Sequence, residues 1–150
     1  MLLKNLLDGV KYNILQGNEN IDIGKIEYDS RKVEKNDVFV CIAGFKTDGH
    51  NFAKKAVESG AAALICQRMP ENINNDVTII KVDDSRKTLA IISDNYYNHP
   101  AEKMNVIGVT GTNGKTTTTF LIKSVLDRIN HKVGIIGTIE NRIGDKILHT

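Results

Sequence analysis

The sequence has few cysteines and no tryptophan, and its apolar runs are short. Its 150 residues include two cysteines and two prolines. Cys41 and Cys66 each lie inside an apolar, strand-like run, and their separation is unlike the spacing of metal ligands. We interpret both cysteines as buried structural residues, so a cysteine-held metal site is not expected.

No apolar stretch approaches the roughly 20 residues that a membrane-spanning helix needs. The start of the chain, residues 1–8, is interrupted by polar side chains, unlike a signal peptide. The 20 basic and 18 acidic residues are spread along the chain and give a net charge of only +2, without a basic stripe. These absences predict a cytoplasmic protein that binds small molecules and has neither a membrane nor a nucleic acid as partner. They leave the oligomeric state open.

The first 100 residues have the pattern of a mixed α/β domain. Three apolar runs predict buried strands, at residues 38–43, 61–66 and 77–82. Asp48 and Asp84 each precede a helical pattern and can cap a helix. Pro100 disfavours helical geometry in the residue before it, so a domain boundary is expected at 98–103. The first domain is therefore predicted to span residues 1–100.

The remaining residues, 103–150, predict one β-α-β unit. The expected elements are a strand at 106–110, a helix at 115–130 and a strand at 133–136. The apolar face of the helix comprises Leu121, Ile122, Val125, Leu126 and Ile129, which we expect to face a core. A parallel sheet needs several such units to cover both of its faces. We therefore expect this segment to be the truncated start of a second domain.

A glycine-rich loop separates the predicted strand at 106–110 from the helix that follows. It reads Gly111, Thr112, Asn113, Gly114, Lys115, Thr116 and Thr117. Its glycines let backbone N–H groups turn toward phosphate oxygens, Lys115 can reach the β and γ phosphates, and Thr116 is placed as a ligand of Mg²⁺. Each hydrogen bond to a charged group contributes about 1.5–3 kcal/mol, against about 0.3–1 kcal/mol from the helix dipole. The loop predicts an ATP site with Lys115 as its catalytic residue.

Two observations bear on this prediction. The general phosphate-loop pattern requires glycine at position 109, where this sequence has Val109, and Gly108 comes one residue too early. The alternative is a glycine-rich turn with a solvated lysine. That alternative leaves the four consecutive β-branched residues at 116–119 unexplained, since threonine is a poor helix former.

Residues 110–117 resemble the variant phosphate loop of the Mur ligases, which join amino acids to the peptidoglycan precursor. Five further segments resemble the uridine-nucleotide-binding domain of this family, at residues 28–33, 37–40, 44–50, 60–63 and 84–86. The resemblance extends from about residue 26 to residue 138. It implies a uridine-nucleotide-binding domain followed by the first β-α-β unit of a P-loop ATPase domain.

The resemblance also implies site residues and a reaction. Ser30 and the backbone around Tyr28 would contact the uridine diphosphate group, and Phe45, Lys46 and Thr47 would close over it. The implied enzyme uses ATP and Mg²⁺ to phosphorylate the D-glutamate side chain of UDP-N-acetylmuramoyl dipeptide. The amine of a diamino acid, meso-diaminopimelate in preference to L-lysine, then attacks the acyl phosphate.

Several alternatives remain. Thr112 and Asn113 favour a diamino-acid-adding ligase over the related D-Ala-D-Ala-adding ligase, which typically has serine at this point. The chain could instead be a precursor-binding module with an idle phosphate loop. A small-molecule kinase or a GTPase would not explain the amino-terminal segments, and the guanine-binding motif Asn-Lys-x-Asp is missing from the sequence.

Some of the polar residues also have a purely structural interpretation. Asp29 and Arg31 can form a surface ion pair, and Asp48 can serve only as a helix cap. His50 is interpreted as a solvated residue at the start of a helix. The other histidines are His99, His131 and His149, and we assign none of the four to a metal.

Overall fold

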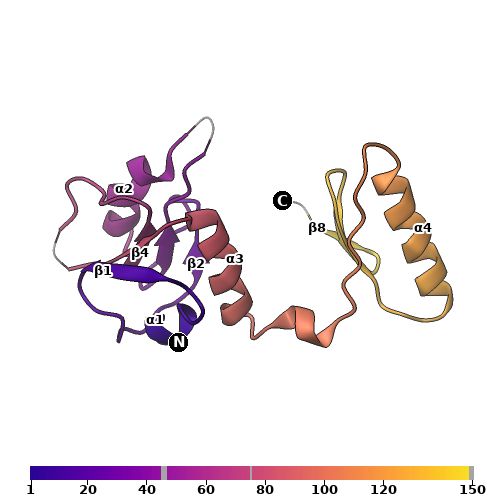
Figure 1. The fold of residues 1–150 in the computed structure, drawn as a ribbon, viewed down its shortest axis with the longest axis horizontal. Coiled ribbons are helices and arrows are strands. Elements are labelled where there is room, and N and C mark those ends of the chain that lie inside the picture. The colour runs from indigo at the N-terminus through magenta and orange to yellow at the C-terminus, as the bar shows by residue number, and fades with distance from the viewer. Residues whose placement is uncertain (45–46, 75, 149–150) are drawn as a thin grey trace. The chain divides into compact units, whose positions relative to one another are not determined.

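The computed structural model describes residues 1–44, 47–74 and 76–148. The chain forms two compact units, Met1–Met104 and Asn105–Thr150 (Figure 1). The division lies between Met104 and Asn105, one residue beyond the segment 98–103 where the sequence predicts a boundary. Phe45 and Lys46, both predicted to bind the precursor, lie outside the described residues.

Unit 1 is built on a five-stranded sheet with the order β1-β5-β4-β3-β2. The strands are β1 (Tyr12–Gln16), β2 (Ile26–Glu27), β3 (Val38–Val40), β4 (Ala63–Cys66) and β5 (Thr78–Val82). Strands β2 to β5 are parallel, whereas β1 pairs antiparallel with β5. The ladder of β1 shifts register between Ile14 and Gln16. The sheet therefore has a bulged strand at one edge and a two-residue strand at the other.

The helical segments of unit 1 are α1 (Leu3–Leu6), η1 (Gly49–Phe52), α2 (Ala53–Glu58), α3 (Ser85–Tyr96) and η2 (Pro100–Lys103). Residues of β3, β4 and β5 pack alternately into two different cores. In β4, Ala63 and Ile65 join the core that contains residues of α1 and α3, while Leu64 and Cys66 join the core that contains residues of α2. Both faces of the strand are covered, so all four residues are apolar, and this is why the strand was recognisable as an apolar run.

Two helix starts agree with the predicted caps. Asp84 accepts hydrogen bonds from the backbone N–H groups of Arg86 and Lys87 at the start of α3. Asp48 accepts one from the backbone N–H of His50 and so caps η1, which leads into α2. The three predicted strands are confirmed as β3, β4 and β5, but α1 and β1 were not predicted.

Unit 2 contains one helix and a small antiparallel sheet. Its elements are α4 (Lys115–Arg128), β6 (Gly134–Ile136), β7 (Asn141–Ile143) and β8 (Lys146–Leu148), and the sheet order is β6-β7-β8. The helix and the strand after it are confirmed, but 106–110 forms no strand with the described residues. A strand needs a ladder partner, and β6 instead pairs antiparallel with the nearby β7. Gly144, with φ of 57°, allows the tight turn between β7 and β8.

The outer side of α4 is apolar and exposed. Leu121, Val125 and Ile129 are each at least 60% exposed, although the sequence predicted that they face a core. Ile122 and Leu126 are half-buried. The helix packs against β6, so only one of its sides is covered within unit 2. In the described part of the chain, no helix combines the length and apolarity needed to cross a membrane.

Candidate functional site

The loops that follow the four parallel strands of unit 1 lie where these strands end. We call this side of the sheet its carboxyl edge. Carboxyl ends of parallel strands share an edge, where ligands commonly bind in open α/β sheets. Tyr28 and Ser30 follow β2, and Thr47 belongs to the loop after β3. Gln67 follows β4 directly, and Asp84 lies just after β5. The predicted precursor-binding residues that the structure describes are therefore brought to a common edge.

The turn after β2 contains one buried serine and one exposed tyrosine. Ser30 is 8% exposed and Tyr28 is 67% exposed. Arg31 donates from Nη2 to Oδ2 of Asp29 at 2.7 Å and from Nε to Oδ1 at 2.9 Å. These bonds hold the pKa of the Asp29 carboxyl well below its usual range. The predicted ion pair is confirmed, and it fixes the turn on both sides of Ser30.

Two segments after β3, residues 42–44 and 47–49, pair antiparallel with each other, and we call them the two arms of the β3 loop. The Gly49 N–H donates to the Ile42 carbonyl at 2.8 Å, and the Gly44 N–H donates to the Thr47 carbonyl at 3.1 Å. A side chain at Gly49 would bring a Cβ to 2.6 Å from the Ile42 nitrogen. Glycine at this position therefore lets the two arms approach each other.

His50 is buried beside the β3 loop, with 7% of its surface exposed. Its Nδ1 lies 2.6 Å from Oδ1 of Asp48, and its Nε2 accepts the backbone N–H of Gln67 at 3.1 Å. The prediction of a solvated His50 is therefore wrong. The imidazole can be buried because both of its nitrogens have hydrogen-bond partners.

The carboxylate of Asp48 has three partners. Besides the backbone N–H and the ring of His50, it accepts a hydrogen bond from Nη2 of Arg68 at 2.6 Å. The backbone hydrogen bond from His50, followed by the His50 ring and the Arg68 guanidinium, lowers the pKa of Asp48 to about 2. Asp48 is a helix cap, as predicted, and through Arg68 it also joins the β3 loop to the segment that follows β4.

Asp48→Asn is expected to destabilise the chain at neutral pH but not at strongly acidic pH. The folded state lowers the pKa of Asp48 from 3.8 to about 2, so the stability that its charge provides is complete above pH 3.8 and is lost as the pH falls through about 2. Urea unfolding of both proteins across this range measures the difference in unfolding free energy. A difference that stayed constant down to about pH 2 would contradict a role for the charge.

Gln67 joins the loops after β4 and β5. Its Oε1 accepts a hydrogen bond from the Ser85 hydroxyl at 3.0 Å, and its Nε2 donates to the Asp83 carbonyl at 3.2 Å. Arg86 donates from Nη2 to the Ala43 carbonyl in the β3 loop at 3.2 Å. Gln67 and Arg68 are not among the predicted site residues, although they are the first two residues after the buried strand β4, which is the signal that indicates them.

The glycine-rich loop of unit 2 leads into α4. Gly111 and Gly114 have φ values of 145° and 77°, which favour glycine. Nζ of Lys115 donates to the Gly111 carbonyl at 2.6 Å, so the lysine folds back over the loop. Thr116 is half-buried and Thr117 is exposed.

A cavity of about 200 Å³ adjoins the start of α4. It is lined by Lys115 and Thr116 of the helix and by Ile135 of β6, among other residues. Lys115 and Thr116, two of the predicted ATP-binding residues, therefore line this cavity.

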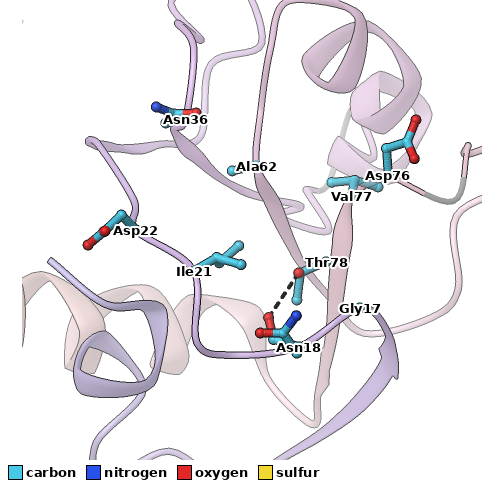
Figure 2. Close-up of a pocket in the computed structure, with 9 residues that line it drawn as sticks. All are labelled: Gly17, Asn18, Ile21, Asp22, Asn36, Ala62, Asp76, Val77 and Thr78. Carbon is cyan, nitrogen blue, oxygen red and sulfur yellow. Dashed lines mark hydrogen bonds between the residues drawn. The ribbon is translucent and has the colours of Figure 1, made fainter.

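A larger cavity, of about 400 Å³, lies at the other end of the parallel strands of unit 1, where β3, β4 and β5 begin. Figure 2 shows the nine residues that line it, with the Thr78 hydroxyl directed at the Asn18 carbonyl. It contains none of the predicted site residues. Among residues 1–44, 47–74 and 76–148, no group of three or more histidine, cysteine, aspartate or glutamate side chains is arranged to hold a metal ion.

Two family models match the chain. Residues 22–97 match "Mur ligase family, catalytic domain", which is just over half of the sequence, and residues 109–150 match "Mur ligase middle domain". The chain belongs to the Mur ligase family. The two matched segments of this Mur ligase chain fall in units 1 and 2 respectively.

Three individual proteins illustrate the similarity. The "UDP-N-acetylmuramoyl-L-alanyl-D-glutamate--2,6-diaminopimelate ligase" of Clostridium tetani is 52% identical over 99% of this chain and 31% of its own length. A solved structure of a ligase with the same name has a TM-score of 0.71 and 22% identity, covers 98% of this chain and 29% of its own, and shows the shared fold. The MurF ligase of Thermotoga maritima, solved in complex with ADP, is 33% identical with a TM-score of 0.54 over 69% of this chain and 23% of its own.

The Mur ligase chain is short relative to these proteins. It spans about 30% of the length of the curated relatives it matches. The glycine-rich loop and the carboxyl edge of the unit 1 sheet are both within the matched segments.

Proposed function

We propose that this chain is part of an ATP-dependent ligase that adds meso-diaminopimelate to UDP-N-acetylmuramoyl-L-alanyl-D-glutamate. The observation that carries the proposal is 52% identity, over 99% of the chain, to a ligase named for this reaction. The site geometry supports it, because one chain carries both a glycine-rich loop before a helix and a polar edge on a parallel sheet. A reaction that consumes ATP also fits the proposed cytoplasmic location.

The carboxyl edge of unit 1 is the proposed site for the uridine nucleotide. Ser30 is a buried residue whose hydroxyl forms no hydrogen bond within the described residues, yet this oxygen is not among buried atoms that lack a partner, so it keeps some access to solvent, and Tyr28 nearby offers an exposed ring. Thr47 lies on an arm of the β3 loop, which is held by hydrogen bonds at its base. Phe45 and Lys46 remain proposals from the resemblance alone.

The glycine-rich loop of unit 2 is the proposed site for ATP. The glycines at 111 and 114 have positive φ values, a conformation in which backbone N–H groups would turn toward a bound phosphate. In the proposed site, Thr112, Asn113 and Thr117 complete the phosphate contacts. Support also comes from the relative at 33% identity that was solved with ADP. Lys115 would exchange its bond with the Gly111 carbonyl for bonds to phosphate oxygens.

The donor set near this loop fits Mg²⁺ bound together with a nucleotide. Mg²⁺ keeps several waters and usually takes one or two protein ligands plus phosphate oxygens. Thr116, at the start of α4, offers one hydroxyl, and no carboxylate cluster competes within the described residues. When bound, the ion would neutralise charge on the transferring phosphoryl group.

The proposed reaction has two steps. A carboxylate oxygen of the substrate's D-glutamate side chain attacks the γ-phosphorus of ATP, the bond to the bridging oxygen breaks, and ADP leaves. The amine nitrogen of diaminopimelate then attacks the acyl carbon, phosphate leaves, and the amine loses a proton. Lys115 would stabilise the negative charge of the transferring group, so the loop positions and stabilises rather than acting as a nucleophile.

Calorimetric titration of the 150-residue chain tests both sites separately. We expect binding of UDP-N-acetylmuramoyl-L-alanyl-D-glutamate and, more weakly, of UDP, together with a preference for ATP over GTP. Precursor binding without any ATP binding would favour a module with an idle phosphate loop. ATP or GTP binding without precursor binding would favour a kinase or a GTPase.

Ser30→Ala is expected to weaken precursor binding by roughly 0.5–1.5 kcal/mol without changing ATP affinity, because it removes one neutral hydrogen bond. Calorimetry with each ligand measures both effects. Ser59→Ala is the matched control, since Ser59 is an exposed residue at the end of α2. Unchanged precursor affinity in Ser30→Ala would assign Ser30 a purely structural role in its turn.

A further inference from the structure

Four residues connect the β3 loop to the end of β4. They are His50, Asp48, Gln67 and Arg68, which we call the anchor network. The Asp48 carboxylate and the Gln67 backbone lie on opposite sides of the His50 ring, 2.6 Å and 3.1 Å from its two nitrogens. Because Gln67 donates to Nε2, the ring proton lies on Nδ1 and is donated to Asp48. The ring is therefore a single rigid link between two loops.

The anchor network acts at the base of the β3 loop. Asp48 itself pairs with Ala43 across the two arms, and the adjacent Gly49 donates to Ile42. Arg86, at the start of α3, donates to the Ala43 carbonyl and so holds the opposite arm. The arm that carries Thr47, one residue before Asp48, is thus held by contacts from the residues that follow β4, while Arg86 of α3 holds the opposite arm.

We infer that His50 is a positioning residue for uridine-nucleotide binding. It would set the affinity of the site without contacting the ligand, by holding the β3 loop against the end of β4. The inference rests on the proposed function, which places the nucleotide at this edge. The buried ring has both nitrogens engaged within the protein and so has no free atom for a ligand.

Three variants distinguish the contributions of the hydrogen bonds of the His50 ring from that of the ion pair between Arg68 and Asp48. His50→Ala removes both hydrogen bonds of the ring. His50→Gln keeps an acceptor for the Gln67 N–H but cannot also donate to Asp48 from the same position. Arg68→Gln removes only the outer ion pair, and because the Arg68 side chain is 63% exposed this variant is expected to remain folded. His99→Ala is the matched control, because Nδ1 of His99 also lies 2.7 Å from a carboxylate, that of Asp94, but His99 is exposed and remote in sequence from the β3 loop.

The readouts are UDP-precursor affinity by calorimetry and amide hydrogen exchange of the 150-residue chain. His50→Ala is expected to weaken precursor binding about tenfold, with a smaller loss for His50→Gln and about two- to threefold for Arg68→Gln. Exchange should accelerate at the Gly44 and Gly49 amides. The Ala62 and Thr78 amides, which are bonded to carbonyls at the other edge of the sheet, should be unaffected. His99→Ala should match the wild type in both measurements.

Long-range ¹H–¹⁵N spectra of His50 should show the neutral ring with its proton on Nδ1. The inference is overturned if His50→Ala binds the precursor as tightly as the wild type, or if exchange at Gly44 and Gly49 is unchanged. If the wild type binds no uridine nucleotide, the proposed function fails and with it the role of His50 in binding. Hydrogen exchange, which needs no ligand, would then still show whether the ring anchors the loop.

Discussion

Lys115→Ala is expected to reduce ligase turnover on the order of 10³-fold, in a full-length ligase that contains this chain, while precursor binding stays nearly intact. The lysine lies at the start of α4, where its ammonium donates a hydrogen bond to a carbonyl of the glycine-rich loop. The ammonium can exchange this hydrogen bond for bonds to phosphate oxygens. The proposed uridine site lies in the other unit. Loss of this one cation should therefore affect phosphoryl transfer and not recognition of the nucleotide.

The measurements are steady-state turnover and calorimetric affinity for the UDP precursor. Lys132→Ala is a suitable control, because Lys132 is an exposed lysine of the same unit that lies outside the glycine-rich loop. A comparable loss of turnover and of precursor affinity in Lys115→Ala would contradict two separate sites. Turnover close to that of the wild type would assign the loop a structural role.

The 150-residue chain, produced alone, is expected to show no ligase turnover although unit 1 folds. Unit 1 has two apolar cores that cover both faces of its sheet. Unit 2 leaves Val106, Ile107 and Ile136 more than half exposed, whereas Ile135 is buried. The chain also spans only about 30% of the length of its relatives, so the groups that bind the diamino acid are expected elsewhere in the ligase.

An assay with ATP, Mg²⁺, the UDP dipeptide and diaminopimelate checks this expectation. The control is the Lys115→Ala variant of the same 150-residue chain, which sets the background. Tripeptide product above that background would show that catalysis resides within these residues. Sedimentation velocity should be recorded in parallel, because the exposed apolar side of α4 is expected to promote self-association.

The fold of unit 1 was largely readable because its central strands are buried on both faces. Runs such as 61–66 have no polar residue to mask the pattern, and Asp84 and Asp48 mark helix starts through their capping chemistry. The edge strand β1 was not predicted. Its residues are mostly exposed or half-buried, so tertiary pairing with β5 and not an apolar run defines it.

Unit 2 shows where a local pattern is insufficient. Residues 106–110 have strand-like composition, but a strand exists only when a partner supplies its hydrogen bonds. β6 pairs instead with β7, and the signal for the hairpin that follows was Gly144-Asp145 between two short runs. The outward side of α4 was predicted to be buried because helical periodicity identifies an apolar face and not the element that covers it.

The candidate site also contains residues that could be predicted from the sequence and residues that could not. Tyr28, Ser30 and Thr47 were assigned through the resemblance to the Mur ligases, and their positions after predicted strands agree with a site in the loops. The role of His50 could not be predicted from the sequence, because its partner Gln67 is 17 residues away and donates from its backbone, which carries no side-chain signature. Whether these residues bind the precursor and the loop binds ATP stays a prediction.

The two edges of the unit 1 sheet also bear on aggregation. A long, flat edge strand is a template on which another chain can add a strand, whereas short or bulged edges resist such pairing. β2 offers only two residues, and β1 loses its regular register between Ile14 and Gln16. Substitutions that straightened β1 or extended β2 would therefore open a route to fibrillar assemblies while leaving both cores intact.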